Sequence, residues 1–234
     1  MAKKTNHWGA LAAAAGVLAA VGMLMLMVLV VGEVRPAEAT FPGKNGNIVY
    51  WGNVVGGKGE IFTINPDPVG GARLTNNTTD ERDPSYSPDG KTIAYSGWDG
   101  SDYEIYTMNS GGGGTVQVTH SRLRNDHDPS YSPDGKKIAY QRYDGTDWEI
   151  FASNSDGSSG TVQLTSNARD DLHPSYSPDG TKIAYSGILI CPGCPEQPDE
   201  TREIFTINAS GGDGRALTNT ALDEQDPSWG NLVE

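Results

Sequence analysis

Four side chains that can carry charge or bind a metal occur directly before a proline that recurs along the chain. They are Asp83, Asp128, His173 and Asp226. If the repeats surround one axis, three carboxylates and an imidazole lie close together, and a bound cation or a proton would relieve their repulsion. Carboxylates suit calcium, and a neutral imidazole adds a ligand for other metals. The pattern predicts a cation site, calcium or another ion; the alternative is that these side chains cap neighbouring turns.

The chain has two cysteines, Cys191 and Cys194, which are separated by a proline and a glycine. A zinc site would need two further close ligands, and there is no other cysteine. The pair lies in an insertion rather than at the start of a helix, which argues against a redox-active pair. In an oxidising compartment the spacing therefore predicts a small disulfide that closes the insertion 188–198; the alternatives are free thiols or a metal shared between molecules.

The elements that position these residues belong to one repeated unit. Residues 83–127 and 128–172 are equal in length and repeat at a spacing of 45 residues, and 173–225 aligns with eight extra residues. Each unit contains PSYSPDG, an IAY segment, EI followed by an aromatic residue, and a short segment that ends in threonine. These segments are rich in β-branched and aromatic residues, and the Asp-Gly pairs beside them favour tight turns. Four short strands repeated in this way are typical of propeller blades.

The first and last copies are incomplete. The repeats begin with a second-strand segment at 47–51 and end with a lone first-strand segment, DPSWG, at 226–230. We therefore predict an all-β propeller of four blades with four antiparallel strands each, closed by pairing of Pro227–Trp229 beside Ile48–Tyr50. The predicted blades are 46–82 with 226–230, 83–127, 128–172 and 173–225. A monomer that closes on itself and a dimer that completes a larger ring both satisfy this pattern.

One polar residue also keeps its place in all four copies of the third strand. A glutamate heads this strand each time, at Glu60, Glu104, Glu149 and Glu203. A charged residue at one fixed place in every unit indicates a repeated structural contact.

The motif PSYSPDGKKIAY, followed by EI with Phe or Tyr and then LT, resembles the repeats of TolB-like, WD-repeat-like propellers. The resemblance covers roughly residues 44–230. It implies a propeller that most often presents a non-catalytic surface for binding a protein or another ligand. The TolB propeller has six blades, whereas four sets of repeats occur here, so the resemblance does not carry over a particular partner.

The N-terminal segment has the composition of an export signal. Lys3 and Lys4 precede an uncharged, mostly apolar run of 24 residues from Gly9 to Gly32, and the segment ends in the small-x-small sequence Ala37-Glu38-Ala39. This order predicts a signal peptide cleaved after Ala39, although the run is also long enough to remain as a membrane anchor. Residues 1–39 are thus a signal peptide or anchor, and 40–234 form the propeller. In both cases the propeller lies outside the cytoplasm: secreted, periplasmic or anchored at the cell surface.

Charge and motifs narrow the function. The formal net charge of −13 would repel nucleic acid, and no G-x-S-x-G nucleophile motif is present. We predict a non-catalytic binding or scaffold module of the cell envelope, whose partner is a protein or an envelope-associated ligand. The alternative is a carbohydrate-active lyase or hydrolase that uses carboxylates on the propeller face.

Overall fold

The computed structural model describes residues 46–54, 56–66, 70–189, 201–220 and 222–230. The chain separates into two units, Met1–Gly43 and Lys44–Glu234, and only the second contains described residues. The predicted signal peptide or anchor and the predicted disulfide between Cys191 and Cys194 lie outside the described residues. Within the described ranges, no helix has the length and apolar character needed to cross a membrane.

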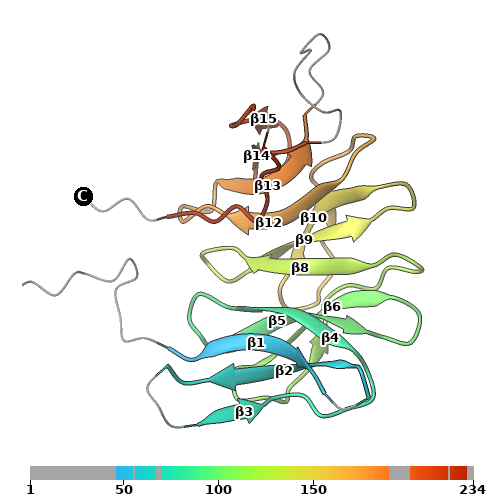
Figure 1. The fold of residues 1–234 in the computed structure, drawn as a ribbon, viewed down its shortest axis with the longest axis vertical. Coiled ribbons are helices and arrows are strands. Elements are labelled where there is room, and N and C mark those ends of the chain that lie inside the picture. The colour runs from blue at the N-terminus through green and yellow to red at the C-terminus, as the bar shows by residue number, and fades with distance from the viewer. Residues whose placement is uncertain (1–45, 55, 67–69, 190–200, 221, 231–234) are drawn as a thin grey trace, which may run out of the picture. The chain divides into compact units, whose positions relative to one another are not determined.

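The described residues form four antiparallel sheets, which we call blades 1 to 4 (Figure 1). Blade 1 contains β1 (Ile48–Asn53), β2 (Gly59–Ile64) and β3 (Gly71–Arg73). Blade 2 contains β4 (Glu81–Tyr86), β5 (Thr92–Trp98), β6 (Tyr103–Asn109) and β7 (Val116–Gln117). Blade 3 contains β8 (Asp126–Tyr131), β9 (Lys137–Tyr143), β10 (Trp148–Asn154) and β11 (Val162–Gln163). Blade 4 contains β12 (Asp171–Tyr176), β13 (Lys182–Ile188), β14 (Arg202–Asn208) and β15 (Arg215–Ala216).

Local turn chemistry sets the register between the first and second strands of a blade. In blade 2, Gly90 adopts a φ of +68°, and its N–H donates to the carbonyl of Ser87 over 2.9 Å. The Asp89 carboxylate accepts from the Ser87 hydroxyl and from the Lys91 N–H. Glycine tolerates this positive φ because it has no Cβ, as the predicted Asp-Gly turns require. The same turn joins the first two strands of blades 3 and 4.

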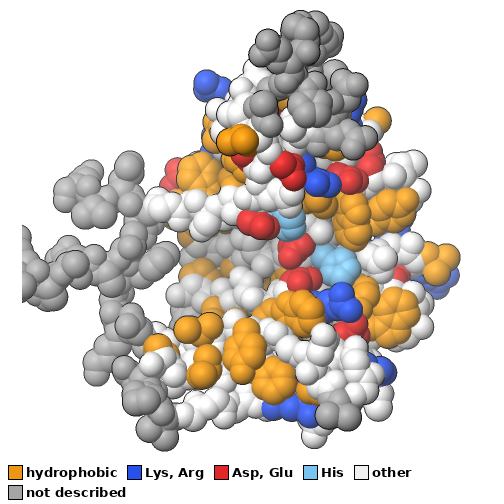
Figure 2. All heavy atoms as spheres, in the orientation of Figure 1, with side chains coloured by type: hydrophobic (Ala, Val, Ile, Leu, Met, Phe, Trp, Pro, Cys, Tyr) orange, Lys and Arg blue, Asp and Glu red, His pale blue; other side chains and the backbone are white. Residues whose placement is uncertain are grey.

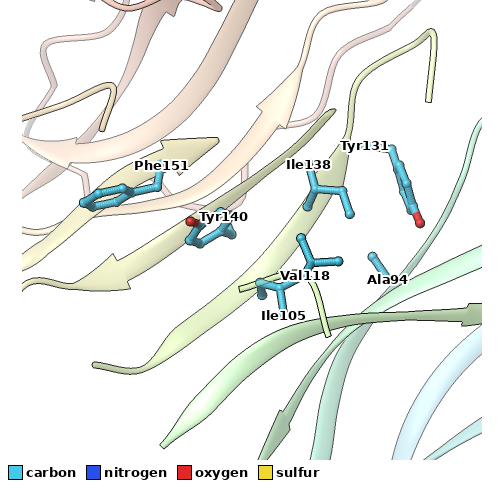
Figure 3. Packing of buried hydrophobic residues seen from close by; sticks show 7 residues of the cluster. All are labelled: Ala94, Ile105, Val118, Tyr131, Ile138, Tyr140 and Phe151. Carbon is cyan, nitrogen blue, oxygen red and sulfur yellow. The ribbon is translucent and has the colours of Figure 1, made fainter. Parts of the chain in front are cut away.

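The hydrophobic core lies between successive blades rather than within one sheet. Figure 3 shows the cluster between blades 2 and 3, where Ile138 and Tyr140 of β9 lie near Ile105 and Val118 of blade 2. Equivalent clusters join blade 1 to blade 2 and blade 3 to blade 4. The first strands are neighbours as well, since β4 contacts β8 and β8 contacts β12. The four sheets, the antiparallel pairing and the inter-blade cores confirm the predicted all-β propeller architecture.

The predicted closure by the C-terminal segment is not observed. Among the described strands, β1 pairs only with β2, and residues 226–230 form no strand. The indole N–H of Trp229 instead donates a 3.0 Å hydrogen bond to the carbonyl of Ser175 in β12. Pairing with β1 would require blade 4 to pack against blade 1, but Ile48 of blade 1 and Leu217 of blade 4 remain 55% and 54% exposed. The segment therefore extends the row of first strands beyond blade 4.

Replacement of Ile138 by alanine tests the inter-blade core. Ile138 is 0% exposed, so Ile138→Ala should lower the free energy of unfolding by about 2–5 kcal/mol, as measured by urea denaturation. Leu222 is 69% exposed, and Leu222→Ala should change it by less than about 0.5 kcal/mol. Equal effects of the two substitutions would contradict a core placed between the blades.

Candidate functional site

The four residues before the repeated prolines share an uncommon backbone conformation. Their φ angles are +51° at Asp83, +53° at Asp128, +52° at His173 and +54° at Asp226. In β4, β8 and β12 the register with the second strand shifts at this point, so each strand contains a β-bulge. Proline has no N–H, so no donor is left unpaired there. A left-handed φ is costly for a residue with a Cβ, and such strain concentrates at functional sites.

The bulges bring the four predicted site residues close together. The His173 ring lies between two carboxylates, with Nδ1 3.2 Å from Oδ1 of Asp226 and Nε2 4.0 Å from Oδ2 of Asp128. The carboxylate of Asp83 is near enough to Asp128 to act on its pKa. These contacts join residues from blades 2, 3 and 4 and from the C-terminal segment. We call the four residues, together with His127, the bulge cluster.

His127 is a member of the cluster that the repeat pattern does not predict. Its Nδ1 lies 3.1 Å from Oδ2 of Asp83, and the pair connects blade 3 to blade 2. The repeat alignment gives no signal for this residue, because the equivalent positions hold Arg82 and Leu172. A bulge interrupts the alternation of side chains along a strand, so two consecutive residues, His127 and Asp128, can both reach the cluster.

The bulge cluster has its own electrostatic balance. Burial raises the pKa of Asp128 to about 6, and the neighbouring carboxylate of Asp83 acts in the same direction. Positive charge on His173 or His127 acts in the opposite direction. The two imidazoles can therefore neutralise part of the negative charge when they are protonated.

A cation at the bulge cluster stays a prediction. Among the described residues, three ligand atoms of acidic, histidine or cysteine side chains lie within 4.8 Å of one another only at Asp99, Asp102 and Glu104. In that group Asp99 accepts from the Ser101 N–H and Asp102 from the Arg124 N–H, each over 2.8 Å. The Asp99 bond stabilises the local turn, and the Asp102 bond joins this turn to the segment that leads into β8, so both aspartates have structural roles. The ligand atoms of the bulge cluster lie farther apart than those of such a three-ligand group.

Rings and a guanidinium form a continuous row beside the bulge cluster. Arg82 lies 5.4 Å from the ring centroid of Trp51 and 5.6 Å from that of Tyr103. The His127 ring lies 4.6 Å from Tyr103 and 5.7 Å from Trp148. We call these five residues the aromatic band. Its members come from β1, β4, β6, β8 and β10, so the band crosses the interfaces between blades 1, 2 and 3.

Polar contacts hold the centre of the aromatic band in place. The carboxylate of Asp80 accepts from Arg82 over 2.7 Å and from the Tyr103 hydroxyl over 2.6 Å. Burial alone would raise the pKa of Asp80, but these two hydrogen bonds keep it below its ordinary value. Figure 2 shows histidine and acidic side chains next to one another, with hydrophobic and basic side chains around them. This arrangement can offer both aromatic faces and negative charge to a ligand.

Comparison with known families agrees with this architecture. The TolB beta propeller domain, PD40, matches residues 43–233. The chain belongs to this TolB-type propeller family. No match was found among curated proteins.

Solved structures of the family are also similar to the chain. A putative TolB from Agrobacterium tumefaciens has a TM-score of 0.62 and 26% identity, over 73% of this chain and 60% of that one. TolB from Acinetobacter baumannii has a TM-score of 0.59 and 22% identity, over 76% of this chain and 42% of that one. The chain thus spans less than two thirds of either TolB chain.

Hydrazine synthase from Kuenenia stuttgartiensis also matches, with a TM-score of 0.61, 17% identity and coverage of 75% of this chain and 32% of that one. Since an enzyme is among the matches, the fold alone does not distinguish binding from catalysis.

Each third strand of this TolB-type propeller also contributes to a pair of carboxyl groups. The pairs are Glu60 with Glu81, Glu104 with Asp126, Glu149 with Asp171, and Glu203 with Glu224. At Glu149 and Asp171 one residue bridges both groups: the Asn167 N–H donates to Glu149 over 2.5 Å, and its side-chain amide donates to Asp171 over 2.7 Å. Each pair joins a third strand to the first strand of the next repeat, which explains the glutamate at the head of every third strand.

The pair of Glu149 and Asp171 favours a bound proton. The two side chains are 1% and 4% exposed. Burial raises the pKa of Asp171 to about 7, and the neighbouring Glu149 carboxylate acts in the same direction. The equivalent pair between blades 2 and 3 differs, because Arg142 donates two hydrogen bonds of 2.7 and 2.6 Å to Asp126 and supplies a positive charge there.

Stability should therefore depend on pH through Asp171. Because its folded pKa lies above the ordinary value, the folded protein binds more protons than the unfolded chain between about pH 4 and pH 7. The free energy of unfolding should fall as pH rises through this range, by up to about 1.4 kcal/mol per unit of pKa shift. Asp171→Asn should reduce this fall, as measured by urea midpoints at about pH 5 and pH 8.

The net negative charge of the protein also lowers the free energy of unfolding as pH rises. A control substitution that removes a carboxylate elsewhere is therefore needed. Asp156 lies exposed in a turn, and Asp156→Asn should leave the pH dependence close to that of the wild type. If the free energy of unfolding falls by the same amount in Asp171→Asn and in wild type between the two pH values, the conclusion that the pKa of Asp171 is raised is wrong.

Proposed function

We propose that this chain is an exported, non-catalytic propeller that binds a protein or an envelope-associated ligand through the bulge cluster and the aromatic band. The observation that carries this proposal is the continuous row of Trp51, Arg82, Tyr103, His127 and Trp148 beside the clustered carboxylates. Rings of this kind contribute much of the binding energy at protein interfaces.

The charge of this face supports a ligand with positively charged groups. Asp83, Asp128 and Asp226 bring three carboxylates to the bulge cluster, and among the described residues the ion pairs of these carboxylates are with His127 and His173. Within the aromatic band, the charge of Arg82 is paired with Asp80. A lysine or arginine of a partner could therefore contact aromatic faces and carboxylates together.

Export is part of the proposal because of the order of residues in the N-terminal segment. A basic start, an apolar run and a small-x-small end at Ala37-Glu38-Ala39 are the pattern of an export signal. The propeller would then act in the periplasm, at the cell surface or outside the cell. A binding module in that location fits a partner that belongs to the envelope.

The burial of Glu104 and Asp171 argues against their use in the alternative, a carbohydrate-active lyase or hydrolase, and leaves Asp128, whose pKa is raised to about 6, as the acid that such an enzyme would use. A glycosidase needs a raised-pKa acid that reaches the substrate. Burial raises the pKa of Glu104 to about 8 and that of Asp171 to about 7, yet their side chains are only 1% and 4% exposed. Glu104 also accepts hydrogen bonds from Thr119 and Ser121, which occupy both of its oxygens. These acids are placed to join blades rather than to meet a sugar.

Removal of one ring of the aromatic band tests this proposal. A short lysine-rich peptide, titrated into the protein in a calorimeter, should bind wild type with an affinity that falls as salt is added. Trp148→Ala should weaken this binding about tenfold or more, because a large, half-buried ring of the aromatic band is lost from the contact.

The matched control lies on a different surface of the same blade. Val162 of β11 is 49% exposed, and Val162→Ala should bind the peptide as wild type does. Equal affinities of wild type and Trp148→Ala, or no binding of the peptide by wild type, would contradict the proposal. Turnover of an oligosaccharide by the wild type would favour the alternative.

A further inference from the structure

Blade 1 exposes a face that is buried in every other blade. The second strands carry an isoleucine at equivalent positions: Ile93, Ile138 and Ile183 are each 0% exposed, whereas Ile48 is 55% exposed. A tyrosine two residues further on repeats the contrast: Tyr95, Tyr140 and Tyr185 are 5%, 0% and 5% exposed, whereas Tyr50 is 43% exposed. The difference is one of position, because a preceding blade covers this face in blades 2, 3 and 4.

Blade 4 exposes the complementary face. In blades 2 and 3 this face covers the next blade, and its residues Val118 and Leu164 are 4% and 7% exposed. The equivalent Leu217 of blade 4 is 54% exposed. The repeated interface between blades is thus present as two uncovered halves, one on blade 1 and one on blade 4.

The C-terminal segment forms no strand, but it shares two features with the first strands. Asp226 adopts the same positive φ as the residue before the proline in β4, β8 and β12. Its carboxylate contacts His173, and Trp229 donates to the carbonyl of Ser175, so the segment lies beside β12 as the first strand of a following blade would. In the described residues it has no second strand, while β1 has no first strand.

We propose that a second copy of this chain supplies the missing neighbour, with blade 1 of one copy docked on blade 4 and on residues 226–230 of the other. The occupant follows from the repeat: blade 1 carries the isoleucine and the tyrosine at the same positions as the blades that already pack in this way. Within one chain the two halves do not meet, because Ile48 and Leu217 are both exposed in the same structure. The contact also places Asp226 of one copy between His173 of its own chain and blade 1 of the other copy.

The repeats specify the register of this contact. In the three complete blades the residue after the proline pairs with the residue after the isoleucine: Ser85 with Ala94, Ser130 with Ala139, and Ser175 with Ala184. The equivalent pair between copies is Ser228 with Val49, and the next pair is Trp229 with Ile48. A slip by one residue would turn every side chain to the opposite face, so the register is sharply specified.

Cysteine cross-linking between two different single variants tests the proposal. The full chain, purified in detergent with Cys191→Ser and Cys194→Ser, is made as Ser228→Cys and, separately, as Val49→Cys. After the two proteins are mixed and oxidised, a dimer should appear on a non-reducing gel and disappear on reduction. Replacing the Val49→Cys partner by Ile48→Cys should lower the yield about tenfold, because that side chain lies on the other face of the strand.

A protein that carries both Ser228→Cys and Val49→Cys distinguishes closure within one chain from contact between two copies. If the double variant forms a disulfide without a change in size, and the mixed single variants form none, the ring closes on itself and the proposal is wrong. It is also wrong if no cross-link forms in either experiment. The melting temperature of each variant, measured first, shows that the substitutions leave the fold intact.

Discussion

The contact between the second strand of one blade and the third strand of the preceding blade is the interaction on which the rest of this propeller depends. A single antiparallel sheet of this kind has no core of its own, and the buried residues gather between the sheets. Ile138 is fully buried because blade 2 precedes it, and Ile48 is largely exposed because no described blade precedes it. Stability in such an array is the sum of the interfaces, so an uncovered end is a cost that only a further neighbour can remove.

Polar contacts also join successive blades. The carboxyl pair of Glu149 and Asp171 joins a third strand to the next first strand, beside the apolar contact between blades. The bulges before the prolines bring Asp128 and His173 from successive first strands within reach of each other. The propeller therefore uses its repeat twice: buried acids join the blades, and partly exposed acids and histidines form a face that can bind a ligand.

Much of this could be predicted from the sequence because the repeat carries local signals. The Asp-Gly pairs set the turns, the IAY segments form the buried second strands, and the four residues before the prolines do lie together. The role of His127 could not be predicted, since its contact with Asp83 depends on a bulge that the repeat alignment does not reveal. Closure was the error, because the sequence matches a first strand to β1 without specifying whether one chain can bring them together. That outcome depends on the angles between four packed blades, which no single repeat encodes.

Amide hydrogen exchange in β1 tests the central claim most directly, namely that blade 1 is completed by a copy of the same chain. The account predicts that amides of residues 48–52 exchange more slowly as the protein concentration rises, while those of β5, whose neighbours are in its own chain, do not change. Exchange in β1 that is independent of concentration would contradict it.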